Sequence, residues 1–214
     1  MHNIVFDTNI FFNTEDGSDF PKNPQERIDL VGSFAARGKI SGGLIFVTTP
    51  SVIDELKEFE QKNGFYIAEL LAHVEVKAPS YLEIELSSSF VRDLIQESRD
   101  RSYRGLVIAE EVAVEVAKDN TLQAAATDHI LFQKSIGAFI TRLRERYRQA
   151  TRHKWIDSTA DLDLILLAKE LDGLLFSNDE GVILWGRKLG LRELVVTQSK
   201  AKIENLLAVT KPAA

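Results

Sequence analysis

The sequence predicts an α/β fold built on a parallel sheet and interrupted by a long helical hairpin. Short, predominantly apolar runs such as Ile4–Phe6 and Leu44–Thr48 are typical of buried strands, and helix-prone segments follow them. This strand–helix alternation favours parallel pairing with right-handed crossovers. It stops in mid-chain and resumes near the C-terminus, so we expect one domain, residues 1–79 and 155–214, that carries an inserted hairpin, residues 80–154.

The composition excludes several classes of site. The 214 residues include no cysteine, which rules out disulfides, thiolate zinc sites and a cysteine nucleophile. The formal net charge of −6 gives no global argument for nucleic-acid binding, so any such argument must come from local charge. No secretory signal and no apolar run of membrane-spanning length is visible, and we therefore expect a cytoplasmic protein without a membrane partner.

The first strand ends in an acidic residue. Asp7 follows Ile4–Phe6 directly, and Thr8 and Asn9 are positioned to hold its carboxylate by local hydrogen bonds. The alternative is an ordinary turn after a strand, in which Asp7 has no chemical role.

The next stretch continues the alternation of helices and strands. Glu55 lies in an early turn of a helix that follows the end of a strand, so it would face a site at the carboxyl edge of the sheet. The alternative, about equally expected, is that Glu55 belongs to a solvated acidic first turn with no chemical role. The elements expected here are a helix from Asn23-Pro24 to near Gly38, a strand over 44–48, a helix from Thr49-Pro50 to near Gly64, a short helix over 65–73 and a strand edge over 74–76.

The insertion is expected to be two helices. Residues 86–118 are helix-prone, with a break expected at Gly105, and Asp119-Asn120 marks a turn before a second helix over 121–150. Apolar residues on both helices supply more surface than one hairpin buries, which suggests a second subunit.

The second helix ends in a run of positive charge, TRLRERYRQATRHK. Arginine forks match phosphate oxygens, and interleaved aromatic rings stack on bases. A solvated helix face is the usual explanation of such a run, but acids are nearly absent from it in a chain that is acidic overall, so we expect a phosphate-binding surface. Its basic residues are Arg142, Arg144, Arg146, Arg148, Arg152 and Lys154.

A second acidic stretch begins after the insertion. Asp157 and Asp161 lie one helical turn apart, Ser158 is suited to cap the helix, and the apolar residues that follow suggest a buried helix ending at Asp172-Gly173. The remaining elements expected are a strand over 174–176, a helix over 180–189, a strand over 193–197 and a helix over 199–208.

Carboxylates from distant parts of the chain are expected to meet at the carboxyl edge of the sheet. Asp7, Asp161 and Asp179 are the inner candidates, and Asp157, Asp163 and Glu55 the outer ones, with Thr8, Asn9 and Ser177 as supporting polar groups. Asp163 ranks lower because two residues along a helix turn it away from Asp161. Clustered hard oxygens suit Mg²⁺ or Mn²⁺, and two such ions can hydrolyse a phosphodiester without a protein nucleophile. The alternative is structural, with Asp161 and Asp163 favouring the helix dipole and Asp179 capping the next helix.

Four motifs in this order, VFDTN, IDELKEF, DLDLILLA and SNDEG, resemble those of PIN-domain nucleases. The late string DSTADLDLILLAKELDGLLFSNDEGVILWGRKLGL, together with the insertion, is similar to the RNA-free ribonuclease P family of bacteria and archaea. The resemblance implies a PIN-like three-layer fold and metal-dependent removal of the 5′ leader from precursor tRNA, without an obligatory RNA subunit. It also implies that Asp7, Asp157, Asp161 and Asp179 are the acidic site residues, with Asp163 close by, and that the inserted helices assemble a large homo-oligomer and contact tRNA.

Three alternatives remain at this point. A toxin-type PIN endoribonuclease would use the same carboxylates, but such chains are usually shorter and lack the insertion. A haloacid-dehalogenase-like phosphohydrolase requires a second aspartate two residues after the first, where this chain has Asn9. A non-catalytic RNA-binding assembly protein would carry the acidic cluster as a remnant.

Overall fold

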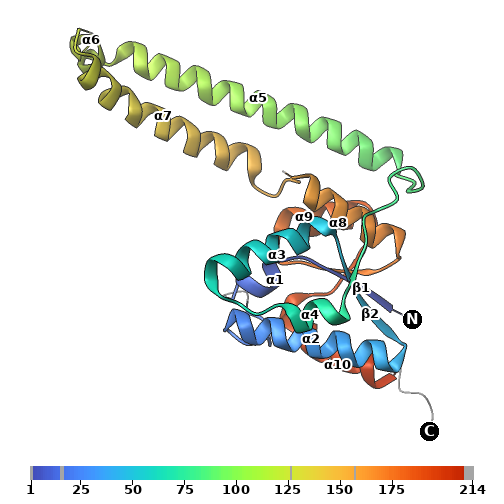
Figure 1. The fold of residues 1–214 in the computed structure, drawn as a ribbon. Helices are drawn as coiled ribbons and strands as arrows, with labels where there is room; N and C mark the ends of the chain where they lie inside the picture. The colour runs from blue at the N-terminus through green and yellow to red at the C-terminus, as the bar shows by residue number, and fades with distance from the viewer. Residues whose placement is uncertain (1, 15–16, 126, 157, 210–214) are drawn as a thin grey trace. The chain divides into compact units, whose positions relative to one another are not determined.

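A computed structural model describes residues 2–14, 17–125, 127–156 and 158–209 (Figure 1). The chain divides into two compact units. The first comprises Met1–Leu86 and Ile156–Ala214 and contains the sheet, and the second comprises Ser87–Trp155 and is helical. None of the helices in these described ranges is long and apolar enough to cross a membrane.

The first unit is an α/β fold with a parallel sheet of five strands, as the sequence predicted. The strand order is β3-β2-β1-β4-β5, so β1 lies in the centre and the order reverses between β1 and β4. Phe6 pairs with Phe176, which brings the carboxyl ends of β1 and β4 level with each other. The strands are β1 His2–Phe6, β2 Leu44–Thr48, β3 Glu75–Val76, β4 Leu174–Phe176 and β5 Arg192–Glu193.

Helices cover both faces of this sheet, which gives three layers. In Figure 1, α2, α4 and α10 lie on one face and α8 and α9 on the other. The helices of the unit are α1 Asn9–Phe12, α2 Pro24–Ser41, α3 Pro50–Asn63, α4 Ala68–His73, α8 Thr159–Glu170, α9 Glu180–Lys188 and α10 Ser199–Val209, with a 3₁₀ turn over Val196–Gln198.

The core explains the apolar runs in the sequence. Ile4–Phe6 of β1 and Leu174–Phe176 of β4 are buried on both faces, because helices cover both sides of the sheet. Leu164–Ala168 of α8 are also all buried, as expected for a helix that is apolar almost all round.

The helix α2 begins where the sequence predicted but ends later. Asn23 caps it by accepting hydrogen bonds from the backbone N–H groups of Gln25 and Glu26, at 2.8 and 3.3 Å. The end expected near Gly38 is wrong, since α2 continues to Ser41 and Gly42 provides the left-handed turn. Gly38 lies inside the helix. Glycine suits this position because β2 approaches so closely that a Cβ would collide with the carbonyl of Leu44.

The second unit contains α5 Ser88–Lys118, α6 Asn120–Ala125 and α7 His129–Arg152. The break expected at Gly105 is wrong, because α5 is continuous and Gly105 makes room for the ring of Tyr147 on α7. The single helix expected over 121–150 is also wrong: α7 begins again after Asp128, whose carboxylate caps Ile130 N and Leu131 N at 2.9 and 3.1 Å.

The last strand is shorter than predicted. β5 covers only Arg192–Glu193, and a 3₁₀ turn occupies part of the strand expected over 193–197. Leu194 N still donates to Leu175 O, at 2.8 Å, but β4 itself ends at Phe176, whose carbonyl accepts from Asp7 N of the other neighbouring strand end. The short helix expected from residue 65 starts at Ala68.

Candidate active site

Asp7 lies directly after β1 and is held by three side chains. Asn9 Nδ2 donates to Asp7 Oδ2 at 2.6 Å, and Ser177 Oγ donates to the same oxygen at 2.8 Å. Thr8 Oγ1 lies 3.3 Å from Asp7 Oδ1, a weaker contact because its single proton is also shared with Glu55 Oε2 at 2.6 Å. Donors from both neighbouring strand ends thus fix the orientation of this half-buried carboxylate.

The ends of β1 and β4 are joined by polar contacts. Asn9 Oδ1 accepts a hydrogen bond from Asn178 N at 2.8 Å, and Ser177 Oγ accepts one from Asp179 N at 3.0 Å. These contacts lie where the strand order reverses, the usual place for a binding site in an open α/β sheet.

Asp179 and Asp161 both lie at helix starts. Asp179 Oδ1 caps α9 by accepting from Gly181 N at 2.6 Å and Val182 N at 3.0 Å. The structural role expected for Asp179 is therefore present, but a carboxylate has two oxygens and one engaged in capping does not prevent the other from binding a ligand. Asp161 lies in the first turn of α8, and its N–H is capped by Ser158 Oγ at 3.1 Å.

The outer candidates have different surroundings. Glu55 of α3 accepts a hydrogen bond from Thr8 Oγ1 at 2.6 Å, so one hydroxyl group contacts both Glu55 and Asp7. Asp163 Oδ1 instead accepts from Tyr81 Oη at 2.8 Å. Asp157, the remaining candidate, lies outside the residues that the structure describes.

The surroundings of Asp7 disfavour its charged form. Its pKa is raised from 3.8 to about 6, chiefly because burial disfavours the charged form and further because Asp161 and Glu55 repel it, while the hydrogen bond from Ser177 acts in the opposite direction. Asp161 and Glu55 are therefore close enough to act on Asp7. A divalent cation beside these carboxylates would offset their repulsion.

Within the ranges that the structure describes, no group of three or more His, Asp or Glu side chains is arranged to hold a metal ion. Asp157 is not part of that set. The described geometry thus brings Asp7 together with Glu55 and Ser177 by direct or shared hydrogen bonds, and with Asp161 by charge.

The basic run of α7 is partly neutralised by α5. Arg142 Nη1 contacts Glu115 at 2.7 Å, and Arg146 contacts both Glu111 and Glu115. These acids lie outside the basic run, on the other helix of the hairpin, so the run by itself looks more strongly positive than it is. The signal was available, since Glu111 and Glu115 lie one turn apart on the helix expected to pair with α7.

The other arginines of the run surround a groove on the second unit. Its volume is about 530 Å³. Among the described residues no ion pair involves Arg144, whereas Arg148 pairs with Glu145 at 2.6 Å. The residues that line the groove are Ala109, Leu143, Arg144, Tyr147, Arg148 and Arg152.

Comparisons with known proteins identify the family. A family model described as a PINc domain ribonuclease matches residues 3–208. The RNA-free ribonuclease P of Hyperthermus butylicus is 36% identical over 190 residues, which cover 87% of this chain and 80% of the relative. The protein of that name from Nitrosococcus oceani is 32% identical over 215 residues and covers 99% of both chains, and that from Pyrococcus furiosus is 28% identical over 207 residues, 97% and 95% of the two chains.

PIN nucleases generally depend on divalent metal ions. The matches extend over almost the whole chain, including the helical insertion, and agree with the motifs identified in the sequence. The chain therefore belongs to the PINc domain ribonucleases and, among them, to the RNA-free ribonuclease P family.

Proposed function

We propose that this endoribonuclease removes the 5′ leader from precursor tRNA without an RNA subunit and leaves a 5′-phosphate on the tRNA. The supporting observation is the joined end of β1 and β4, where Asp7 is oriented by hydrogen bonds and destabilised by neighbouring carboxylates. Relatives named RNA-free ribonuclease P that align over nearly the full chain supply the substrate class.

The proposed cofactor is Mg²⁺ or Mn²⁺, bound as two ions. Hard carboxylate oxygens suit these ions, and the repulsion that raises the pKa of Asp7 is the kind that a cation relieves. When bound, the ions would lower the pKa of a water molecule and stabilise charge on the phosphate. The proposed ligands are Asp7, Asp157, Asp161 and Asp179, with Glu55 and Asp163 as weaker candidates.

The chain's own groups would position that chemistry. Asn9 and Ser177 hold one oxygen of Asp7, so the carboxylate does not reorient when substrate arrives. The hydroxyl group of Thr8 contacts both Asp7 and Glu55 and so fixes the position of the two carboxylates relative to each other. Asp163, engaged by Tyr81, is the weakest of the proposed ligands.

The hairpin would contact tRNA phosphates and recognise the shape of the RNA more than its sequence. Arg144 is the first candidate, because among the described residues no ion pair involves it, and Arg148, Arg152 and Lys154 extend the same run. Arg142 and Arg146 rank lower because they pair with acids of α5. Exposed apolar side chains on the same helices support assembly into a homo-oligomer. They include Val91, Ile95, Tyr103, Leu106, Val114, Ile130, Leu131 and Ile140.

The deciding experiment incubates the purified protein, free of RNA, with a precursor tRNA. We expect a single cut at the mature 5′ end, lost with a chelator and restored by Mg²⁺ or Mn²⁺. Asp161→Asn should abolish the cut but retain RNA binding. Asp172→Asn is the matched control, because Asp172 follows the C-terminal end of α8 and its side chain is 95% exposed. Cleavage at many sites in unstructured RNA would favour a toxin-like nuclease, and binding without cleavage an RNA-binding assembly protein.

Two paired variants test the hairpin. Replacing Arg144 and Arg148 with glutamine should weaken tRNA binding and reduce the slope of log K against log salt by about one for each phosphate that is no longer neutralised. The same change at Arg142 and Arg146 should have a smaller effect, because both of those cations pair with acids of α5, whereas among the described residues no ion pair involves Arg144 and Arg148 pairs with Glu145 of its own helix. Equal salt slopes in both variants and the unaltered protein would remove the basic helix from the proposal.

A further inference from the structure

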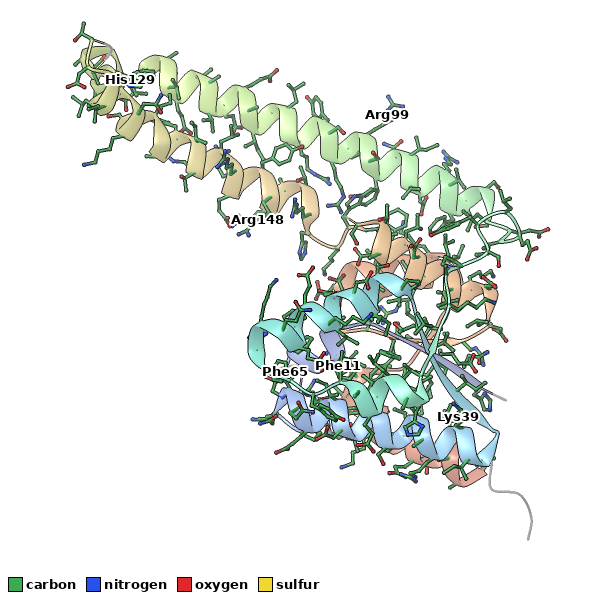
Figure 2. The ribbon with its side chains drawn as sticks, in the orientation of Figure 1. Phe11, Lys39, Phe65, Arg99, His129 and Arg148 are labelled. Atoms are coloured by element: carbon green, nitrogen blue, oxygen red, sulfur yellow. The ribbon has the colours of Figure 1, made fainter. Side chains whose placement is uncertain are left out.

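Three phenylalanines gather beside the acidic site, and we call Phe12, Phe59 and Phe65 the aromatic platform. The rings of Phe12 and Phe59 are stacked, with centroids 4.0 Å apart and an interplanar angle of 27°. The ring of Phe65 lies 5.6 Å from that of Phe12. Phe11 continues the contact into the core, with its centroid 6.3 Å from Phe12, and Figure 2 labels Phe11 and Phe65 on this part of the first unit.

The platform differs from the other phenylalanines of the first unit in its exposure. Every other phenylalanine of that unit is buried, whereas Phe12, Phe59 and Phe65 are each only half-buried. Gly64 ends α3 in a left-handed conformation, φ 71°, after which the chain brings Phe65 back to Phe12. Apolar rings from three segments therefore share one partly solvated surface.

Two rings of the platform lie on helices that also contribute residues to the surroundings of Asp7. Phe12 follows Asn9 by one turn of α1, and Phe59 follows Glu55 by one turn of α3, a spacing that places side chains on the same helix face. The hydrogen bond from Thr8 Oγ1 to Glu55 Oε2, at 2.6 Å, fastens the start of α1 to α3. The platform is thus continuous with the residues that surround Asp7.

We propose that the aromatic platform stacks the base of the leader nucleotide immediately 5′ of the cleaved bond. This inference rests on the proposed function. In a precursor tRNA the leader is single-stranded, whereas the nucleotide on the other side of the cut is paired in the acceptor stem, so the leader base is the one with a free face. Aromatic rings bind any base through its π face, so a nuclease that processes many leaders gains affinity without sequence preference.

A double-substitution cycle tests the proposal, with affinity measured in an Asp161→Asn background so that cleavage does not interfere. Removing the leader base, by an abasic nucleotide, should weaken binding to the otherwise unaltered protein by about 5- to 150-fold. Phe59→Leu, which keeps apolar bulk but loses the ring, should weaken binding of normal substrate to a similar extent. The abasic change should then cause no further loss. Independent losses in this cycle would overturn the proposal.

Fluorescence and a core control complete the test. A 2-aminopurine at the leader position should be quenched on binding, and the quenching should be lost in Phe59→Leu. Phe20→Leu is the matched control, since Phe20 is only 6% exposed and packs against Phe34 and Phe176. It should lower the melting temperature yet keep the full abasic penalty.

The outcomes separate this inference from the proposed function. If the protein binds and cuts precursor tRNA but is indifferent to the leader base, only the platform proposal fails. If the effect of Phe59→Leu persists on a substrate without a leader, the rings contact the end of the acceptor stem instead, and the leader assignment is wrong. If precursor tRNA is neither bound nor cut, the proposed function itself fails.

Discussion

Replacing Asp7 with asparagine should make the metal-free protein more stable at neutral pH while abolishing cleavage. Asp7 is half-buried and lies among carboxylates, and its pKa is raised from 3.8 to about 6. The folded protein therefore bears a cost when Asp7 is ionised, and asparagine removes the charge with almost no change in volume. Such opposition between stability and function is common where a site must hold charge.

The size of the effect follows from the pKa. A rise from 3.8 to about 6 corresponds to about 3 kcal/mol at pH 7. Between these two values the folded state binds more protons than the unfolded state, so the stability of the unaltered protein falls as the pH rises. At pH 4.5 the cost has shrunk to about 1 kcal/mol. The stability gap between Asp7→Asn and the unaltered protein should thus narrow by about 2 kcal/mol from pH 7 to pH 4.5.

The assay is urea unfolding in a chelator, followed by the fluorescence of Trp185, which is buried in the first unit, in a Trp155→Phe background. The amide of asparagine replaces one hydrogen-bond acceptor of Asp7, which lowers the difference in unfolding free energy between the two proteins by a similar amount at both pH values. The change of this difference with pH is therefore the diagnostic quantity. Asp172→Asn, at an exposed position, should leave the gap near zero. A gap for Asp7→Asn that does not change with pH would refute the electrostatic argument.

Three further predictions concern the first unit. Gly38→Ala should lower its free energy of unfolding by about 1–3 kcal/mol, because the new Cβ collides with the backbone of β2. Gly32→Ala, on the same helix, should not, because its Cβ would make only an ordinary van der Waals contact with Leu70; equal melting temperatures of the two variants would contradict this. Arg27→Lys should lower the free energy of urea unfolding by about 2–4 kcal/mol, because the buried guanidinium donates to three carbonyls and a hydroxyl that lysine cannot reach together. An unchanged free energy of unfolding would show that these contacts do not stabilise the fold. Thr8→Val should reduce single-turnover cleavage about tenfold by releasing Glu55, with activity kept in Thr8→Ser; equal rates in both variants would exclude a role for the hydroxyl.

Some features of the fold are encoded locally. The apolar runs of β1, β2 and β4 identified strands, and Asn23 and Ser158 identified helix starts, because a cap is a contact between residues two or three apart. The order of acidic motifs along the chain identified the family for a similar reason, since it depends on residue types and spacing alone.

Other features depended on segments far apart in sequence. Gly38 and Gly105 look alike as helix interruptions, yet both allow close approach, of β2 in one case and of the Tyr147 ring in the other. The charge of α7 looked unopposed until α5 placed Glu111 and Glu115 against it.

The sequence by itself predicted most of the elements that form and which residues are candidates for the chemistry. Only the tertiary structure decided which of them meet: Thr8 with Glu55, Asn9 with the end of β4, and Phe12 with Phe59. The physical reason is that propensity and capping act within one or two turns of the chain. Burial, ion pairing and the pKa of Asp7 depend on neighbours that long-range packing supplies.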